Sequence, residues 1–166
     1  MARVVVLLGP PGSGKSTVGA ALGRFGLRWR DWEPTILERW GSRQGFLAEK
    51  QLALPWLHDE IIRWIESDER RAVVETTGLS DAPLLDRLDR AGMSFVARLD
   101  VSEAAAMLRV QERPRNQHLT DDVESNRAIW RAFDELVMPN RRFDAAFDTE
   151  ALSAERIAAQ ISALDA

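Results

Sequence analysis

The sequence contains no cysteine and no tyrosine. The absence of cysteine excludes disulfide bonds, thiolate catalysis and cysteine metal sites, and it is compatible with a reducing compartment. Lysine is also scarce, because Lys15 and Lys50 are the only two and every other basic residue is arginine. Where such a chain uses lysine, a compact ammonium on a flexible stem is indicated, and Lys15 lies in a motif described below.

The chain also lacks an excess of positive charge. Its 166 residues carry 22 basic and 26 acidic side chains, which gives a net charge of −4 and a pI near 5.3. Charges of both signs are mixed along the sequence, so there is no broad positive field for nucleic acid or for an anionic membrane surface. We therefore expect a small-molecule partner and no membrane, and nucleic acid is disfavoured.

Long hydrophobic runs are missing as well. The only N-terminal apolar run, Val4 to Leu8, is shorter than a signal-peptide core of about 7–15 residues or a transmembrane helix of about 20. A chain of this length with 45% apolar residues is typical of one globular domain. We expect a single domain over residues 1–166, a cytoplasmic protein, and a monomer or weak dimer.

Predicted strands and helices alternate along the chain. Val4–Leu8 is a β-branched and leucine run typical of a strand covered on both faces, and helical spacing over residues 15–25 ends at Gly26. Further strands are predicted at 71–75, 93–99 and 143–148, followed by helices at 82–91, 102–113 and 153–164. The alternation predicts a parallel α/β sheet with right-handed crossovers.

Two more helical stretches, residues 34–65 and 121–138, do not fit this alternation. The first is predicted to break near residues 41–45 and at Pro55, and both are candidate caps over a site. Residues 113–118, which precede the second stretch, are polar and arginine-rich and contain Pro114, so they predict an exposed loop.

Residues 9–16 match the pattern G-x-x-x-x-G-K-[ST], directly after the first strand and before the first helix. Glycines let backbone N–H groups turn around a β-phosphate, Lys15 reaches the β- and γ-phosphates, and Ser16 offers a hydroxyl to Mg²⁺. A glycine-rich turn with a chance lysine is the alternative. No Asn-Lys-x-Asp segment for guanine occurs, so ATP is favoured. The predicted nucleotide-binding residues of this loop are Gly9, Gly12, Ser13, Gly14, Lys15, Ser16 and Thr17.

Short motifs follow this loop in a distinctive order: Leu-Arg-Trp-Arg-Asp-Trp-Glu at 27–33, Val-Val-Glu-Thr-Thr-Gly at 73–78, Leu108-Arg109, Arg113-Pro114, Arg127 before Trp130, and Asp148-Thr149. Over most of the chain this order resembles small P-loop kinases of the shikimate kinase and gluconate kinase type, relatives of the nucleoside monophosphate kinases. The resemblance implies a three-layer α/β P-loop NTPase fold: a five-stranded parallel sheet with helices on both faces, an acceptor-binding cap at about 34–66 and a lid at about 113–121.

The resemblance also implies roles for individual residues. Asp31 matches a carboxylate that serves the metal and the acceptor hydroxyl, and Glu33 replaces a second one. Arg113 matches the lid arginine that reaches the transferred phosphate, and Arg127 resembles an arginine in the helix after the lid. Two further matches concern adenine, which Arg109 and Thr149 are predicted to border.

The residues alone leave alternatives open. Asp31 and Glu33 follow a predicted strand, where either carboxylate can orient a hydroxyl or a metal-bound water, or can cap the next helix. Glu75 can act near the metal, bond to the phosphate loop or meet solvent at its strand end. Thr77 and Gly78 follow it and are candidate acceptor contacts.

The acceptor half departs from the family. Phe46 is followed by Leu47 where shikimate kinases have an acceptor-binding arginine, and Gly78 is followed by Leu79 where they have a second glycine. Shikimate is therefore not predicted as the acceptor.

The remaining aromatic and imidazole side chains have simpler interpretations. Trp29 and Trp32 flank Asp31 as candidate walls of an acceptor pocket, whereas tryptophans 56 and 64 are predicted to pack helices. His58 and His118 lack metal-ligand companions.

The leading hypothesis is an ATP- and Mg²⁺-dependent kinase that phosphorylates a small-molecule hydroxyl, with Lys15, Asp31 and Arg113 as catalytic residues and with Asp31, Glu33, Thr77, Gly78 and Arg127 binding the acceptor. Ser16 and Asp31 are the predicted metal residues. The alternative is an ATP-binding regulatory module or slow ATPase without a phosphate acceptor, and a nucleic-acid end kinase is a third, less favoured hypothesis.

Overall fold

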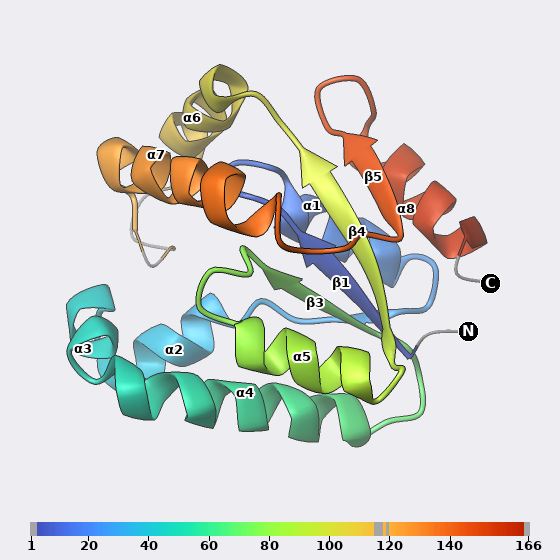
Figure 1. The fold of residues 1–166 in the computed structure, drawn as a ribbon, viewed down its shortest axis with the longest axis horizontal. Helices are drawn as coiled ribbons and strands as arrows, with labels where there is room; N and C mark the ends of the chain where they lie inside the picture. Colours follow the sequence, from blue (N-terminus) through green and yellow to red (C-terminus); the bar gives the residue numbers. More distant parts are fainter. Residues whose placement is uncertain (1–2, 115–117, 119, 165–166) are drawn as a thin grey trace.

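The computed structural model describes residues 3–114, 118 and 120–164. Five parallel strands form one sheet in the order β2-β3-β1-β4-β5 (Figure 1). The strands are β1 (Val4–Leu8), β2 (Arg28–Trp29), β3 (Ala72–Thr76), β4 (Ser94–Asp100) and β5 (Ala145–Asp148). The predicted five-stranded parallel sheet is confirmed.

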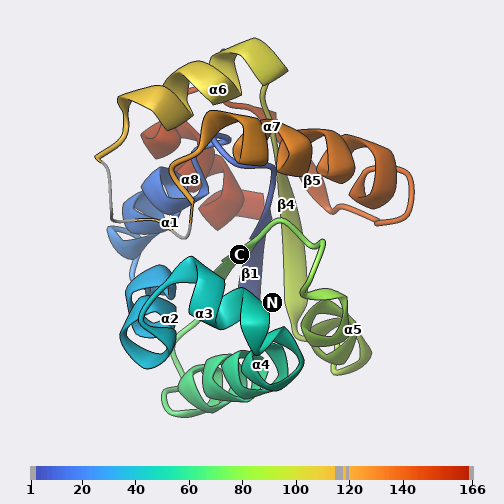
Figure 2. The ribbon, with the colours of Figure 1, turned by 90° about the vertical axis from the view of Figure 1, so that its left-hand side faces the viewer.

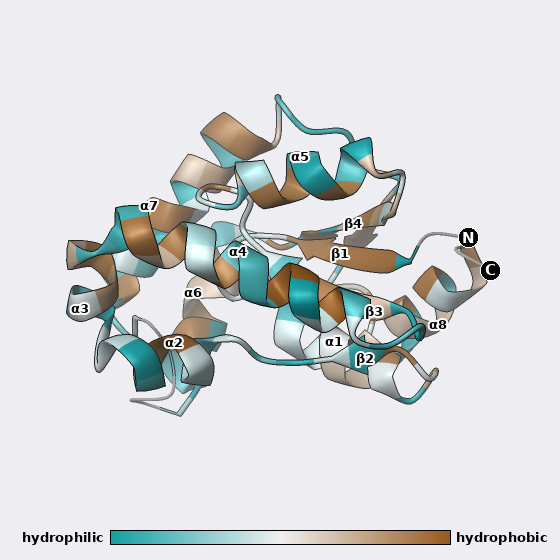
Figure 3. Cartoon of the chain, turned by 90° about the horizontal axis from the view of Figure 1, so that it is seen from below, coloured by the Kyte–Doolittle hydropathy of each residue, from teal (hydrophilic) through white to brown (hydrophobic). Residues whose placement is uncertain are grey.

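Helices cover both faces of the sheet because successive residues of its central strand point to opposite sides. Val4, Val6 and Leu8 of β1 belong to one hydrophobic core, whereas Val5 and Leu7 belong to the other. The first core includes residues of α4 (Lys50–Glu66), α5 (Ala82–Arg90) and the π-helical η1 (Phe133–Val137), and the second includes residues of α1 (Lys15–Gly23) and α8 (Ala154–Leu164). Figure 3 shows hydrophobic strands at the centre and hydrophilic residues on the surrounding helices.

The remaining helices lie near the edge of the sheet where the strands end. On one side are α6 (Glu103–Glu112) and α7 (Val123–Ala132), and on the other are α2 (Glu33–Trp40) and α3 (Arg43–Ala48) (Figures 1 and 2). In parallel sheets this edge gathers the ligands. Residues 115–117 and 119 of the predicted lid lie outside the described residues.

The predicted break at Gly41 is confirmed, because α2 ends there with a left-handed φ of 71°. The predicted break at Pro55 is wrong, since α4 continues through it. Proline lacks the N–H that would bond to the carbonyl four residues earlier. The helix persists because apolar side chains on both sides of the proline, including Ala53 and Leu57, are buried in the core.

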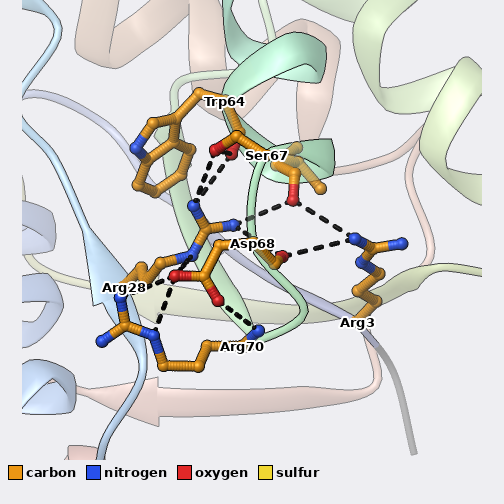
Figure 4. Close-up of polar contacts among 7 residues, drawn as sticks. Arg3, Arg28, Trp64, Ser67, Asp68 and Arg70 are labelled. Carbon is orange, nitrogen blue, oxygen red and sulfur yellow. Dashed lines mark hydrogen bonds and ion pairs between the residues drawn. The ribbon is translucent and has the colours of Figure 1, made fainter.

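Two arginines hold the C-terminal end of α4 near the start of β2 (Figure 4). The Arg28 guanidinium at the start of β2 donates to the carbonyl of Trp64 at 2.9 Å and to that of Ile65 at 2.8 Å, and lies over the Trp64 ring. Arg3 adds a bond of 3.4 Å to the Ile65 carbonyl. These bonds satisfy helix carbonyls that have no partner within the helix, and they tie α4 to β2.

The part of the chain that the structure describes contains no helix long and apolar enough to cross a membrane.

Candidate functional site

The phosphate loop between β1 and α1 depends on glycine at two positions. Gly12 and Gly14 have φ values of 76° and 85°, a region that side chains other than glycine rarely adopt. A Cβ added to Gly12 would lie 2.3 Å from the carbonyl oxygen of Ala106 on α6. The loop therefore packs directly under α6 and leads into the N-terminus of α1, which is the arrangement that binds a phosphate.

Lys15 lies over this loop. Its ammonium donates to the carbonyls of Gly9 at 2.8 Å and Pro10 at 2.9 Å. Burial lowers the pKa of Lys15 from 10.5 to about 8, while the carboxylates of Glu75 and Glu33 act in the opposite direction. The ammonium is thus held in a largely buried site near two carboxylates, where an arriving phosphate would stabilise its charge.

Glu75 at the end of β3 accepts a hydrogen bond from the phosphate loop. Of the three alternatives for this residue, the structure shows the bond to the loop. One carboxylate oxygen accepts a hydrogen bond of 2.7 Å from the Ser16 hydroxyl, and the other accepts one of 2.9 Å from the Trp29 indole. Burial raises the pKa of Glu75, and Lys15 and these two hydrogen bonds oppose the rise. Ser16 of α1, the predicted metal residue, therefore has a carboxylate partner on β3.

Asp31 follows β2, as predicted, and its carboxylate has a local role. Its Oδ1 accepts a 2.9 Å bond from the backbone N–H of Glu33, at the start of α2. Its charge also contributes to the raised pKa of Glu75, so the two carboxylates lie near each other at the ends of adjacent strands. The carboxylate thus bonds to the first residue of α2, whose N-cap residue Trp32 makes no side-chain capping bond, and the catalytic role of Asp31 stays a prediction.

Glu33 connects three parts of the site. Its carboxylate lies 3.1 Å from Nδ1 of His118, and it acts electrostatically on both Lys15 and Arg113. The predicted acceptor residue therefore lies between the phosphate loop and the start of the lid.

Arg113, where α6 ends, is half-buried and oriented by its neighbours. It donates to the carbonyl of Thr120 at 2.8 Å and to Oδ1 of Asn126 at 3.3 Å. Burial lowers the pKa of Arg113, and the carboxylates of Glu33 and Asp121 oppose this. Asn126 is 2% exposed and also bonds to the Thr120 carbonyl, so it is a positioning residue that the sequence did not indicate.

Arg109 and Thr149 are brought together, as expected for residues that border the same group. The Arg109 guanidinium donates to the Thr149 hydroxyl at 2.9 Å and to its carbonyl at 2.8 Å. It also lies 3.2 Å from the carbonyl of Gly12 in the phosphate loop. The three groups form one side of the site, while their contact with adenine stays a prediction.

Arg127 is placed differently from the other predicted residues. Its guanidinium lies 3.2 Å from Glu103 of α6 and 3.5 Å from Glu124 of α7. These ion pairs direct it between the two helices, and its role in acceptor binding stays a prediction.

The predicted acceptor turn at Thr77 and Gly78 is held by a polar network that the sequence did not reveal. The Thr76 hydroxyl accepts a 2.8 Å bond from the Gly78 N–H and donates to the Asp81 carboxylate, which lies 3.0 Å from Nε2 of His58 on α4. The Thr76 carbonyl accepts a 3.2 Å bond from the N–H of Gly9. The network links α4 to the phosphate loop, and the sequence carries no signal for it because His58 and Asp81 lie 23 residues apart.

The tryptophans of the cap pack against one another. Trp32 is 7% exposed, and its ring lies 5.9 Å from that of Trp64 with the planes nearly perpendicular. Trp40 and Trp56 have ring centroids 5.0 Å apart. Packing is confirmed for Trp56 and Trp64, and Trp32 lies in the core instead of forming a pocket wall.

The residues present fit a magnesium ion that arrives with a nucleotide. Among the described residues no group of three or more His, Asp or Glu side chains could hold a metal ion. Magnesium usually keeps several waters and takes one or two carboxylates together with substrate phosphates. The Ser16 hydroxyl, Glu75 and Asp31 provide a set of oxygen atoms of that kind beside the phosphate loop.

Comparisons with known proteins identify the fold. No protein-family model matches the sequence, and no curated protein matches it. A shikimate kinase from Acinetobacter baumannii in complex with shikimate is similar in structure, with a TM-score of 0.71, 22% identity, and coverage of 99% of this chain and 93% of that chain. Deoxyadenosine kinase from M. mycoides with bound dATP has a TM-score of 0.66, 16% identity, and coverage of 99% and 100%.

A sugar kinase from Janibacter sp. HTCC2649 has a TM-score of 0.64 and 16% identity over 99% of this chain and 94% of that chain. At such identities the likeness shows the fold, which is that of the small P-loop kinases. The predicted three-layer P-loop fold is therefore confirmed.

Proposed function

We propose that this protein is an ATP-dependent kinase that transfers the γ-phosphoryl group to a hydroxyl of a small molecule. The observation that carries the proposal is the contact of Glu75 with Ser16 beside Lys15, with Asp31 at the end of the next strand. This arrangement combines a phosphate cradle, oxygen donors for a metal and a carboxylate for the acceptor, which are the parts that phosphoryl transfer needs.

The nucleotide binds with its phosphates in the loop. Backbone N–H groups around Gly12 and Gly14 and the N-terminus of α1 face the β-phosphate. The Lys15 ammonium leaves the carbonyls of its own loop and bonds to the β- and γ-phosphates. Arg109 and Thr149 border the adenine.

Ser16, Asp31 and Glu75 hold the metal side of the site. Magnesium, when bound, neutralises charge on the β- and γ-phosphates. Ser16 donates one oxygen ligand, while the Glu75 carboxylate orients that hydroxyl. Asp31 faces the same region from the neighbouring strand.

The acceptor lies between the phosphate loop, the cap and the turn at Thr77 and Gly78. Its hydroxyl oxygen attacks the γ-phosphorus as the bond from that phosphorus to the β–γ bridging oxygen breaks. The hydroxyl proton passes to the Asp31 carboxylate, and ADP leaves. Arg113, which the Thr120 carbonyl and Asn126 orient, stabilises the negative charge on the transferred group.

Acceptor-dependent release of ADP tests this proposal. Purified protein with Mg·ATP is offered a panel of hydroxyl metabolites that includes shikimate, gluconate, sugars and deoxynucleosides, and ADP is measured by a coupled assay. At least one acceptor is expected to raise turnover above the rate with water, and Asp31→Asn is expected to abolish the increase. If Mg·ATP binds and no acceptor raises turnover, the protein is a nucleotide-binding module or slow ATPase.

The module is the second candidate function, and two observations favour it. Arg127 is already paired with Glu103 and Glu124, and Leu47 occupies the position of the acceptor-binding arginine of shikimate kinases.

A further inference from the structure

The Trp29 side chain of β2 lies against α1, the helix that follows the phosphate loop. β2 lies beside β3 and α1 (Figure 3), and the Trp29 ring crosses α1 at Gly19. A Cβ added to Gly19 would lie 2.3 Å from the indole nitrogen and 2.4 Å from the adjacent ring carbon. Glycine inside a helix is less favourable than alanine, so the clearance that Gly19 provides has a cost in stability.

The indole uses this clearance to reach a carboxylate. Its N–H donates to Oε1 of Glu75 at 2.9 Å, while Oε2 of the same group accepts the Ser16 hydroxyl at 2.7 Å. An ionised carboxylate accepts hydrogen bonds and donates none, so the Trp29 indole and the Ser16 hydroxyl are the two donors. Glu75 is therefore held from two sides, by the candidate metal ligand on one oxygen and by Trp29 on the other.

We propose that Trp29 is a positioning residue of the nucleotide site, which holds Glu75 against Ser16 so that the hydroxyl is oriented for a magnesium–nucleotide complex. Gly19 provides the space for the indole. This inference rests on the proposed function, since it assumes that the loop binds a nucleotide with its metal. Residues that orient metal ligands through hydrogen bonds typically affect metal affinity about 10- to 100-fold.

The test separates the metal from the nucleotide. Binding of ADP is measured by isothermal titration calorimetry, once with magnesium and once with EDTA, for the wild type and for Trp29→Phe. Phenylalanine keeps an aromatic ring in the core and loses the N–H donor. We expect the Kd for ADP with magnesium to rise about 10-fold and the Kd with EDTA to stay the same, because the loop N–H groups and Lys15 are unchanged.

Two variants make the result decisive. Gly19→Ala keeps Trp29 and Glu75 but displaces the indole, so it should weaken binding only with magnesium while improving the helix propensity of α1. Trp64→Phe is the matched control, because Trp64 packs between Trp32 and Arg28 in the cap, and it should change neither Kd. If Trp29→Phe does not fold, as judged by circular dichroism, Gly19→Ala decides.

The outcomes are distinguishable from a failure of the proposed function. Wild-type protein that binds no ADP with magnesium would refute the nucleotide site itself. If Trp29→Phe and Gly19→Ala both bind ADP with magnesium at the wild-type Kd, the role of Trp29 is overturned. An equal loss with magnesium and with EDTA would also overturn it, since that pattern indicates a general distortion of the loop.

Discussion

Replacing Lys15 by methionine should leave the stability of the ligand-free protein nearly unchanged and should abolish nucleotide binding. The lowering of its pKa from 10.5 to about 8 by burial corresponds to roughly 3 kcal/mol by which folding disfavours the charged ammonium. Methionine has a similar length and no charge, so it removes this cost. It also loses two hydrogen bonds from the charged ammonium to the carbonyls of Gly9 and Pro10, worth about 1.5–3 kcal/mol each.

The gain and the loss nearly cancel at the lower end of that range, so the Tm of the ligand-free variant should stay within roughly 2–4 °C of the wild-type value. Wild-type protein with Mg·ADP at about 100 times its Kd should gain about 2.7 kcal/mol from binding, whereas Lys15→Met should gain almost nothing.

Thermal unfolding followed by circular dichroism, with and without Mg·ADP, measures both effects in one experiment. A ligand-free Tm several degrees below that of the wild type would refute the argument from burial. A ligand-induced shift of wild-type size in Lys15→Met would refute the contact with phosphate. Because general damage to the fold would lower the ligand-free Tm, it cannot produce the expected pattern of an unchanged Tm with a lost ligand-induced shift.

Three further predictions concern Lys15, Arg28 and Arg113. Nucleotide binding needs the protonated ammonium, so affinity for Mg·ADP should be constant below the Lys15 pKa of about 8 and should fall by up to about tenfold per pH unit above it; calorimetry from pH 6.5 to 9.5 measures this, and a flat profile contradicts it. Arg28→Ala should lower the free energy of unfolding by about 2–4 kcal/mol in urea titrations, because its buried guanidinium bonds to the end of α4. Arg24→Ala, which removes an exposed ion pair with Glu155, is the control and should cost less than about 0.5 kcal/mol; equal losses would argue against anchoring of the helix. Arg113→Gln should reduce turnover of Mg·ATP at least about 100-fold while the Kd of Mg·ADP changes little; a loss confined to ADP affinity would assign Arg113 to nucleotide binding instead.

Local sequence patterns determined the phosphate loop, the parallel sheet and the place of Asp31 along the chain. The phosphate loop is encoded in consecutive residues, because glycine at positions 12 and 14 and lysine at 15 act through backbone conformation and a single side chain. The parallel sheet follows from the alternation of apolar runs with helical spacing. Asp31 could be placed at the end of a strand by order alone.

Only the tertiary structure decided which side chains meet. Trp29 and Glu75 lie 46 residues apart, and their contact requires β2 to pair with β3 and Gly19 to leave room for the indole. The pairing of Arg127 with Glu103 depends on how α7 packs against α6. Such contacts involve strand order and packing, to which local residue patterns are insensitive.

The helix through Pro55 shows that tertiary packing can also override a local sequence rule. The local rule predicts a break at a proline, and burial of apolar residues before and after it outweighs the lost hydrogen bond. The sequence by itself therefore determined the fold class and the glycine-rich loop with its lysine. The tertiary structure decided which carboxylates and arginines lie near that loop, because partners distant in the chain are selected by packing.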